Sequence, residues 1–195
     1  MKIGVLALQG DFHKHGEHLN RINVDPVFVR TADDICAIDG LIIPGGESTT
    51  IGKLLLDFGL DTVLKERLDQ GLAVFGTCAG MILMANEIVG RDQFSLKILD
   101  IAVERNAYGR QIDSFEAEFE HELPIDGPLH GVFIRAPRIS RVGPQVKILA
   151  CFEDYPVLVQ SGCYLAASFH PELTDNLELH RYFLSLVASA KEIPV

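Results

Sequence analysis

The sequence predicts an α/β fold: a single domain over residues 1–195 with three layers, α/β/α, around a mostly parallel central sheet with added antiparallel strands. Apolar runs alternate with helical stretches in the first half of the chain, which is typical of a parallel sheet covered on both faces. The second half is rich in β-branched and aromatic residues separated by Gly and Pro, which indicates further strands. No internal repeat or linker divides the chain, so one domain is expected.

The first half opens with a strand over residues 2–8, which alternates too little to have one solvated face and is therefore expected to be buried and parallel. Thr31 and Asp34 form a capping-box-like pattern that begins a short helix, and Gly40 ends it. Further strands are expected at 26–30, 41–44 and 72–76, and further helices near 12–22, 49–58, 61–70 and 79–88.

The second half is expected to add mixed or antiparallel strands and a closing helix. The helix is predicted over about 175–189, because Asp175 and Glu178 stand in capping register. Its apolar face would contain Leu177, Leu184 and Val187. The expected strands cover 98–104, 115–119, 132–134, 146–151, 157–159 and 165–169.

The composition excludes several classes of protein. The chain has 17 basic and 27 acidic residues, a formal charge of -10, and 48% hydrophobic residues. A protein that tracks nucleic-acid phosphates needs a stripe of Lys and Arg, and the sequence has none. The apolar content is too high for an intrinsically disordered protein. A chain of this length can instead bury about 70% of its unfolded surface around one core.

The start of the chain and the cysteines favour a soluble, cytoplasmic protein. The first apolar stretch ends at Gln9-Gly10-Asp11 and is too short for the core of a signal peptide. No stretch approaches the ~18 apolar residues of a spanning helix. The cysteines have neither C-x-x-C spacing nor the density of a disulfide scaffold. Reduced thiols are therefore expected at Cys36, Cys78, Cys151 and Cys163.

Residues 75–80, Phe-Gly-Thr-Cys-Ala-Gly, have the form of a nucleophile elbow, in which a buried strand turns into a helix at Cys78. Small neighbours are needed because the backbone of the nucleophile is strained and its surroundings pack tightly. The helix that follows would direct its positive end at the sulfur, which favours the thiolate. The alternative is an ordinary buried cysteine beside a tight turn.

A cysteine nucleophile needs a base that can later act as an acid, and His170 is the histidine that stands at a predicted strand end. Pro171 favours an extended conformation at His170, which would point the side chains of His170 and Glu172 to the same side. The Glu172 carboxylate would then orient the imidazole, as in a catalytic triad. The alternative is a surface histidine beside a turn.

Consecutive glycines follow the third predicted strand, in Pro-Gly-Gly-Glu-Ser over residues 44–48. An N–H group of this loop and that of Ala79 would supply two donors to an oxyanion. The alternative is a plain turn in which Ser48 or Thr49 caps a helix. A phosphate-binding loop is excluded, because the spacing from Gly46 to Gly52-Lys53 is one residue too long and Leu54 replaces the hydroxyl residue.

Two weaker patterns remain. His13, His15 and His18 suggest a metal site, but only the last two share a helix face and no further ligand joins them, so a solvated helix is favoured. Arg105 and Arg135 each end an apolar run, where an arginine could hold a substrate carboxylate or form an ordinary surface salt bridge.

Together, the Gly-Gly-Glu-Ser loop, the Gly-Thr-Cys-Ala-Gly elbow and His170-Pro171-Glu172 resemble class I (triad) glutamine amidotransferase domains, which are flavodoxin-like. The resemblance runs from end to end. It is greatest to the glutaminase subfamily of pyridoxal 5′-phosphate (vitamin B6) synthase. The segments that carry it are LALQG (6–10), PGGESTTIGK (44–53), VERNAYGRQIDSF (103–115), GVFIRAP (131–137) and SFHPELT (168–174).

The resemblance implies the hydrolysis of glutamine to glutamate and ammonia through a thioester on Cys78, with His170 as acid and base and Glu172 orienting it. It also implies an oxyanion hole formed by Gly45, Gly46 and Ala79. The glutamine itself would be held by Gly46, Glu47, Ser48, Arg105, Ile134 and Arg135.

The resemblance further implies a partner, the pyridoxal 5′-phosphate synthase subunit, which receives the ammonia, and it implies no cofactor and no metal in this chain. Two other functions compete. A free-standing cysteine hydrolase or deglycase of the related elbow fold usually lacks both the His-Pro-Glu and the Gly-Gly-Glu-Ser segments, which are present here. An inactive binding module would be free to lose Cys78 or His170, and neither is lost.

Overall fold

The computed structural model describes residues 1–105 and 114–192. The segment 106–113, which belongs to the VERNAYGRQIDSF motif, lies outside the described residues. A seven-stranded sheet with the order β10-β11-β12-β4-β3-β1-β2 forms the centre. Its parallel strands are β1 (Ile3–Leu6), β2 (Pro26–Val29), β3 (Gly40–Ile43), β4 (Ala73–Thr77) and β12 (Tyr164–Ala167). Its antiparallel edge consists of β10 (Lys147–Phe152) and β11 (Tyr155–Ser161).

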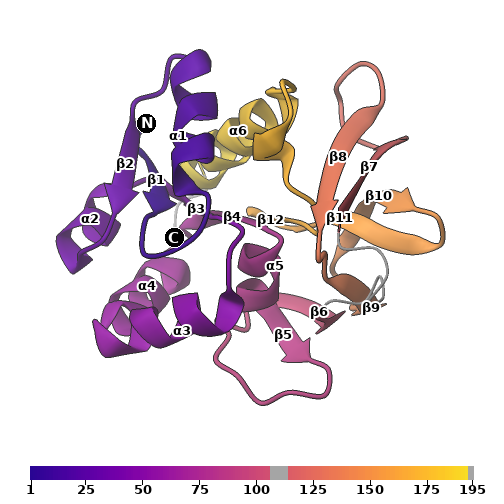
Figure 1. Ribbon diagram of the computed structural model, residues 1–195. Helices are drawn as coiled ribbons and strands as arrows, with labels where there is room; N and C mark the ends of the chain where they lie inside the picture. The colour runs from indigo at the N-terminus through magenta and orange to yellow at the C-terminus, as the bar shows by residue number, and fades with distance from the viewer. Residues whose placement is uncertain (106–113, 193–195) are drawn as a thin grey trace.

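Helices cover both faces of this sheet, which confirms the predicted fold class (Figure 1). On one face lie α1 (Phe12–Arg21) and α6 (Glu178–Glu192). On the other face lie α2 (Ala32–Ala37), α3 (Ser48–Asp57), α4 (Leu60–Asp69) and α5 (Ala79–Met84). The Thr31 hydroxyl accepts from the Asp34 N–H and the Asp34 carboxylate accepts from the Thr31 N–H, so the predicted capping box begins α2.

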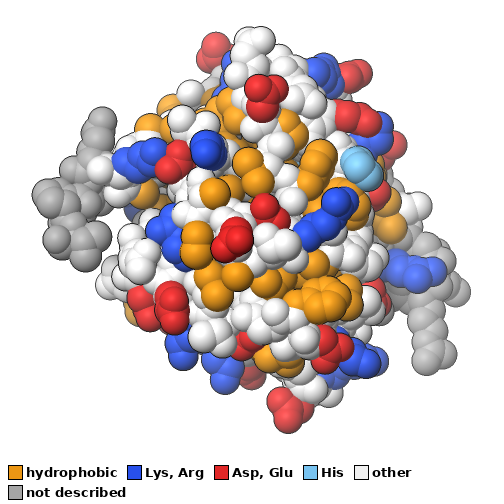
Figure 2. All heavy atoms as spheres, turned by 90° about the vertical axis from the view of Figure 1, so that its left-hand side faces the viewer, with side chains coloured by type: hydrophobic (Ala, Val, Ile, Leu, Met, Phe, Trp, Pro, Cys, Tyr) orange, Lys and Arg blue, Asp and Glu red, His pale blue; other side chains and the backbone are white. Residues whose placement is uncertain are grey.

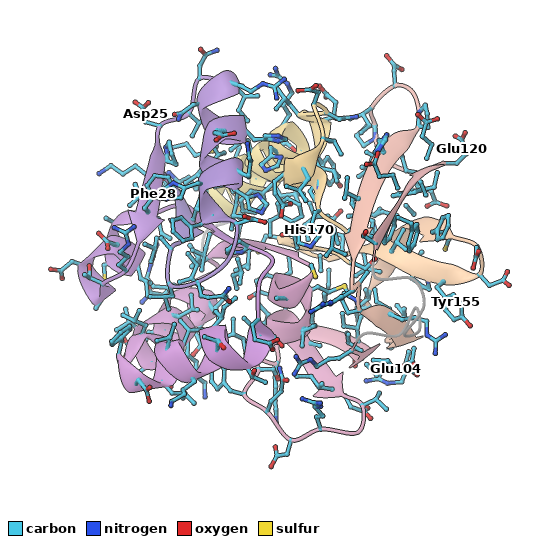
Figure 3. The ribbon with its side chains drawn as sticks, viewed as in Figure 1. Asp25, Phe28, Glu104, Glu120, Tyr155 and His170 are labelled. Carbon is cyan, nitrogen blue, oxygen red and sulfur yellow. The ribbon has the colours of Figure 1, made fainter. Side chains whose placement is uncertain are left out.

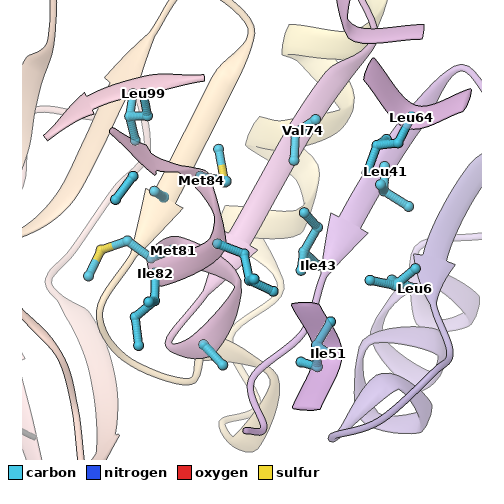
Figure 4. Packing of buried hydrophobic residues seen from close by; sticks show 14 of the residues in the cluster. Leu6, Leu41, Ile43, Ile51, Leu64, Val74, Met81, Ile82, Met84 and Leu99 are labelled. Carbon is cyan, nitrogen blue, oxygen red and sulfur yellow. The ribbon is translucent and has the colours of Figure 1, made fainter. Parts of the chain in front are cut away.

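The core has two parts, one on each face of the sheet, because side chains alternate along a strand. Leu41 and Ile43 of β3 pack with the α2–α5 layer, where Figure 4 shows them beside Leu64 and Ile51. Ile42 of β3 points the other way and packs with the α1 and α6 layer. The central strands are therefore apolar on both faces, as the unbroken apolar runs predicted.

Two smaller sheets lie on the side of the molecule that carries β10 and β11 (Figure 1). One contains β5 (Ala85–Ile88), β6 (Leu99–Glu104) and β9 (Arg138–Val142), and the other is the hairpin of β7 (Ser114–Phe119) and β8 (Leu129–Ile134). Figure 2 shows the opposite side of the molecule, the left-hand side of Figure 1, where acidic and basic side chains are interspersed among hydrophobic ones. The net negative charge does not form a field of one sign there. Among the described residues, no helix is long and apolar enough to cross a membrane.

The structure corrects two predicted helices. The helix predicted over 79–88 ends at Met84, and the chain continues as strand β5, which pairs with β6. A buried apolar run fits either structure, so periodicity could not separate them. The closing helix begins at Glu178 rather than Asp175, because the Asn176 side chain accepts from the Glu178 N–H at 2.8 Å. Its buried face contains Leu179, Phe183 and Val187, whereas Leu177 and Leu184 are partly buried.

We expect Phe183→Ala to lower the free energy of unfolding by about 3–5 kcal/mol, because it opens a cavity in a fully buried part of the core. Phe58→Ala is the matched control, since Phe58 is 60% exposed, and its cost should be within about 1 kcal/mol. Urea unfolding of both variants measures the difference. Equal losses would contradict the packing of α6 on the sheet.

Candidate active site

The candidate site lies at the carboxyl edge of the parallel sheet. The chain leaves β1 toward β2 on one side and then returns to β3 on the other, so its direction across the sheet reverses between β1 and β3. Ligands of open α/β sheets bind outside the carboxyl ends of the strands at such a point. The loops that follow β1, β3, β4 and β12 carry Gln9, Gly45, Cys78 and His170.

Cys78 occupies a strained turn between β4 and α5, with φ 48° and ψ -101°. The Cys78 N–H donates to the carbonyl of Ala167 at 2.8 Å. A Cβ on Gly80 would collide with the carbonyl oxygen of Ile43, so the turn requires glycine at this position. The Cys78 Sγ lies 3.9 Å from the carbonyl oxygen of Ile134. The predicted elbow is therefore present, and it directs the thiol toward the end of β8.

His170 is held through both its backbone and its ring. Its N–H donates to the carbonyl of Val132 in β8 at 2.8 Å. Its Nδ1 lies 2.7 Å from Glu172 Oε1, and the ring lines the same cavity as Cys78. Because Nδ1 faces Glu172, Nε2 is the nitrogen left for the thiol. Figure 3 shows His170 at the centre of the molecule, between the helical layers and β8.

Glu172 reaches His170 by a different route from the one predicted. It lies in the short 3₁₀ helix η1 (Pro171–Leu173) rather than in an extended chain, so the alternation of a strand does not apply. The helical turn folds the carboxylate back onto the imidazole. Glu172 is 1% exposed and His170 is 5% exposed, so their hydrogen bond is shielded from water.

The pKa values of this pair move in opposite directions. Burial alone would lower the pKa of His170, but its hydrogen bonds with Cys78 and Glu172 and the charge of Glu172 outweigh burial and raise this pKa to about 10. Burial alone would raise the pKa of Glu172, but His15 and His170 outweigh it and lower this pKa well below its usual range. The pair is thus an imidazolium and a carboxylate near neutral pH.

Gly45 and Gly46 lie beside this pair. A Cβ on Gly45 would collide with the His170 ring, so the glycine permits the loop to pack against the imidazole. The Gly45 carbonyl accepts from the Asp11 N–H at 3.2 Å, and the Gln9 side chain accepts from the Glu47 N–H at 2.7 Å. The loop after β1 thereby holds the glycine loop in place. Glu47, rather than Ser48 or Thr49, caps α3.

A cavity of about 490 Å³ opens between these loops, which is within the usual range for small-molecule sites. Most of the predicted site residues line it, namely Gly46, Glu47, Ser48, Cys78, Ala79, Arg105, Ile134, Arg135 and His170. Gly45 and Glu172 do not line it. Both are buried: Gly45 packs against the His170 ring, and Glu172 lies within hydrogen-bond distance of His170 Nδ1.

The predicted substrate-binding residues also contact one another. Arg105 Nη2 donates to Glu47 Oε1 at 2.6 Å, and Arg105 Nη1 donates to Gln93 Oε1 at 2.8 Å. The Gln93 amide in turn donates to the Ser48 hydroxyl at 3.2 Å. Burial would raise the pKa of Glu47, but hydrogen bonds from Thr49 and the nearby Arg105 lower it. The Arg105 guanidinium and the Glu47 carboxylate therefore form an ion pair at the cavity wall.

Several residues of the site were missed by sequence reasoning. Asp11, Ile82 and Ser114 line the cavity, and Gln93 links two predicted residues. Asp11 was used only to mark the end of the first apolar stretch, although a polar residue soon after a buried first strand indicates the carboxyl edge of the sheet. Nothing local in the sequence identifies Gln93, because its contacts come from segments distant along the chain.

The prediction that His13, His15 and His18 form a solvated helix is wrong for two of them. His15 is 0% exposed and His18 is 3% exposed, because they share the inward face of α1 with Leu19. His15 and His18 each contact His180 of α6, through nitrogens 2.9 and 3.3 Å apart, and these contacts use different nitrogens of the His180 ring. Within residues 1–105 and 114–192, no group of three or more His, Cys, Asp or Glu side chains has the arrangement of a metal site.

The fold matches that of the class I glutamine amidotransferases. A solved structure described as a glutamine amidotransferase superimposes with a TM-score of 0.92 and 51% sequence identity, covering 96% of this chain and all of that chain. The structure of a putative GMP synthase chain from Thermoplasma acidophilum, at 17% identity and a TM-score of 0.72, covers 98% of this chain and 96% of that chain and shares the fold.

The sequence places the chain in one family of that class. The SNO glutamine amidotransferase family matches residues 5–189, and the chain belongs to this family. The pyridoxal 5′-phosphate synthase subunit PdxT of a Thermus thermophilus strain is 54% identical over 186 residues, which cover 94% of this chain and 96% of that protein. The protein of the same name from Thermotoga maritima is 51% identical over 187 residues, which cover 96% of this chain and all of that protein. The predicted family is thus confirmed.

The raised pKa of His170 predicts a pH dependence of stability. The imidazolium is stabilised in the folded state, so its contribution is complete below the ordinary pKa of 6.5 and disappears as the pH rises through about 10. The advantage of the wild type over His170→Gln in free energy of unfolding should therefore shrink between these values. Urea unfolding across this pH range measures it. An advantage that is constant or grows would contradict the assigned charge state.

Proposed function

We propose that this chain is a single-domain glutaminase over residues 1–195 that hydrolyses glutamine and supplies the ammonia to a pyridoxal 5′-phosphate synthase subunit. The observation that carries the proposal is that Cys78 and His170 line one cavity, with the buried Glu172 carboxylate 2.7 Å from His170 Nδ1. Membership of the SNO glutamine amidotransferase family supports the choice of glutamine.

In the proposed reaction the Cys78 thiolate attacks the side-chain amide carbon of glutamine. The His170 imidazolium donates its proton to the amide nitrogen, so that ammonia leaves and a thioester forms. His170, now neutral, accepts a proton from water, which attacks the thioester and releases glutamate. Glu172 holds the ring so that Nε2 faces the reacting atoms, because its Oε1 accepts from Nδ1.

The negative charge that develops on the amide oxygen needs hydrogen-bond donors. We assign these to the backbone amides of the Gly45–Gly46 loop and of Ala79. Gly46 and Ala79 line the cavity, and Gly45 packs against the His170 ring. The loop is braced from behind by Gln9 and Asp11, so its donors are preorganised.

The amino-acid end of glutamine is zwitterionic, and the cavity wall is charged to match. We assign its α-carboxylate to the cationic side chains of Arg105 and Arg135, and its α-ammonium to the Glu47 carboxylate and the Ile134 carbonyl. We assign Gly46 and Ser48 to the same amino-acid end of glutamine. The Arg105–Glu47 contact at 2.6 Å keeps the two charges in place before the substrate arrives.

The partner follows from the relatives, which are named as subunits of pyridoxal 5′-phosphate synthase. Ammonia released into neutral water becomes ammonium and is no longer a nucleophile, so a synthase benefits from direct transfer. The proposal includes a cytoplasmic location, which suits the free thiols of Cys36, Cys78, Cys151 and Cys163. No cofactor or metal takes part in the proposed chemistry of this chain.

The test is glutamate release from glutamine by the purified chain, alone and with the synthase subunit from the same organism. We expect activity in at least the mixture and a fall of at least about 10³-fold in Cys78→Ser. Cys151→Ser is the matched control and should keep wild-type activity, because Cys151 is exposed and lies outside the cavity. An inactive mixture, or an active Cys78→Ser, would disprove the proposal.

A further inference from the structure

Three buried histidines lie directly behind the proposed triad. His15 and His18 come from α1 and His180 comes from α6, and none of them is more than 3% exposed. His15 lies against Thr77, the residue before Cys78, and against Glu172, whereas His18 contacts His180. Buried polar side chains require partners, and buried histidine clusters are costly to maintain. Nothing in the reaction proposed above uses these residues.

The cluster forms a continuous chain of polar contacts. His18 Nδ1 lies 3.3 Å from His180 Nδ1, and His180 Nε2 lies 2.9 Å from His15 Nδ1. The other nitrogen of His15, Nε2, lies 3.2 Å from the Thr77 hydroxyl and 3.4 Å from Glu172 Oε2. The chain thus connects α6 and α1 to the carboxylate that orients His170.

The two oxygens of Glu172 are in different situations. Oε1 accepts from His170 Nδ1 at 2.7 Å. Oε2 is buried and makes no hydrogen bond of good geometry within the described part of the chain, and His15 Nε2 at 3.4 Å faces it. An ionised carboxylate in the core needs both oxygens satisfied, so a donor facing Oε2 stabilises the charged form.

The direction of the hydrogen bonds follows from the carboxylate, because it only accepts. The nitrogen of His15 that faces Oε2 must therefore carry a hydrogen. In the neutral ring, Nδ1 then accepts from the Nε2–H of His180. The Thr77 hydroxyl holds the same edge of the His15 ring from the side of the elbow.

We propose that His15 is a positioning residue of the reaction centre, which donates from Nε2 to Oε2 of Glu172 and so holds Oε1 on His170. His180 and Thr77 fix the His15 ring in the required orientation. This inference rests on the proposed glutaminase function. It extends the Cys78–His170–Glu172 arrangement by one residue, from a helix that contributes no group to the cavity wall.

The charges around His15 agree with this role. The titratable groups that face it are Glu172 and, through Glu172, His170 from the segment after β12, His180 from α6, and His18 on its own helix. Burial together with the neighbouring His15 lowers the pKa of His180 and of His18, so both are neutral near pH 7. The nearby His15 is also the chief influence that lowers the pKa of Glu172 against burial.

The test compares His15→Leu, which removes the donor, with His15→Gln, whose side-chain amide can place an N–H near the original Nε2. His18→Leu is the matched control, because His18 lies in the same cluster but does not contact Glu172. We expect His15→Leu to lower kcat by at least about tenfold with little change in KM, since His15 does not line the cavity. His15→Gln should recover most of that loss.

The pH profile of kcat/KM separates positioning from mere packing. Without His15, Glu172 binds a proton more readily, so the acidic limb should move to higher pH in His15→Leu and stay in place in His18→Leu. A loss of activity that is uniform across pH, together with equal activities of His15→Leu and His15→Gln, would overturn the proposal. So would wild-type kcat and an unmoved limb in His15→Leu.

The rate of Cys78 alkylation by iodoacetamide across pH provides a readout that needs no glutaminase activity. It should show the same shift of its acidic limb in His15→Leu and not in His18→Leu, with thermal unfolding confirming that each variant is folded. If the wild type releases no glutamate with its partner but this shift is present, the proposed function fails and the positioning role stands. If glutamate is released and the shift is absent, the positioning role fails alone.

Discussion

The structure depends on one buried hydrogen bond, between His170 Nδ1 and Glu172 Oε1 at 2.7 Å. A carboxylate that is 1% exposed is stable only where its surroundings compensate for lost water, and here an imidazole on one side and a histidine cluster on the other do so. This requirement brings α1, α6, β4 and η1 to one point. The layer formed by α1 and α6 therefore covers one face of the sheet and also stabilises the Glu172 carboxylate of the site.

The topology of the sheet brings the other groups of the site together, and the loops need only be short. Parallel strands end at the same edge, so short segments after β1, β3, β4 and β12 meet there. The strained turn at Cys78 is held by the backbone of β3 and β12, and the packing of Gly45 on the His170 ring joins the glycine loop to the same centre. Replacement of Gly80 or Gly45 by a larger residue would therefore displace Cys78 or His170 rather than a surface loop.

The sequence predicted the fold class and the contents of the site well, because both are local. Apolar runs identify buried strands. The elbow and His170-Pro171-Glu172 are short segments, and the residue types within each segment indicate its chemistry. Prediction from the sequence failed where tertiary contacts determine the secondary structure or the burial of a residue. The run over 79–88 divides into α5 and β5 because β6 is available to pair, and His15 is buried because α6 and Glu172 cover it. Strand β9 was missed because it is mostly polar.

The proposed function requires Cys78 to be the nucleophile of a glutamine-specific site. The most direct measurement is intact-mass and peptide analysis after incubation with a glutamine analogue that carries an electrophilic diazoketone in place of the amide, with excess glutamine as competitor. We expect the wild type to form one adduct per chain, on Cys78, and we expect glutamine to suppress it. Labelling of Cys36, Cys151 or Cys163 instead, or labelling of Cys78 that glutamine does not suppress, would contradict it.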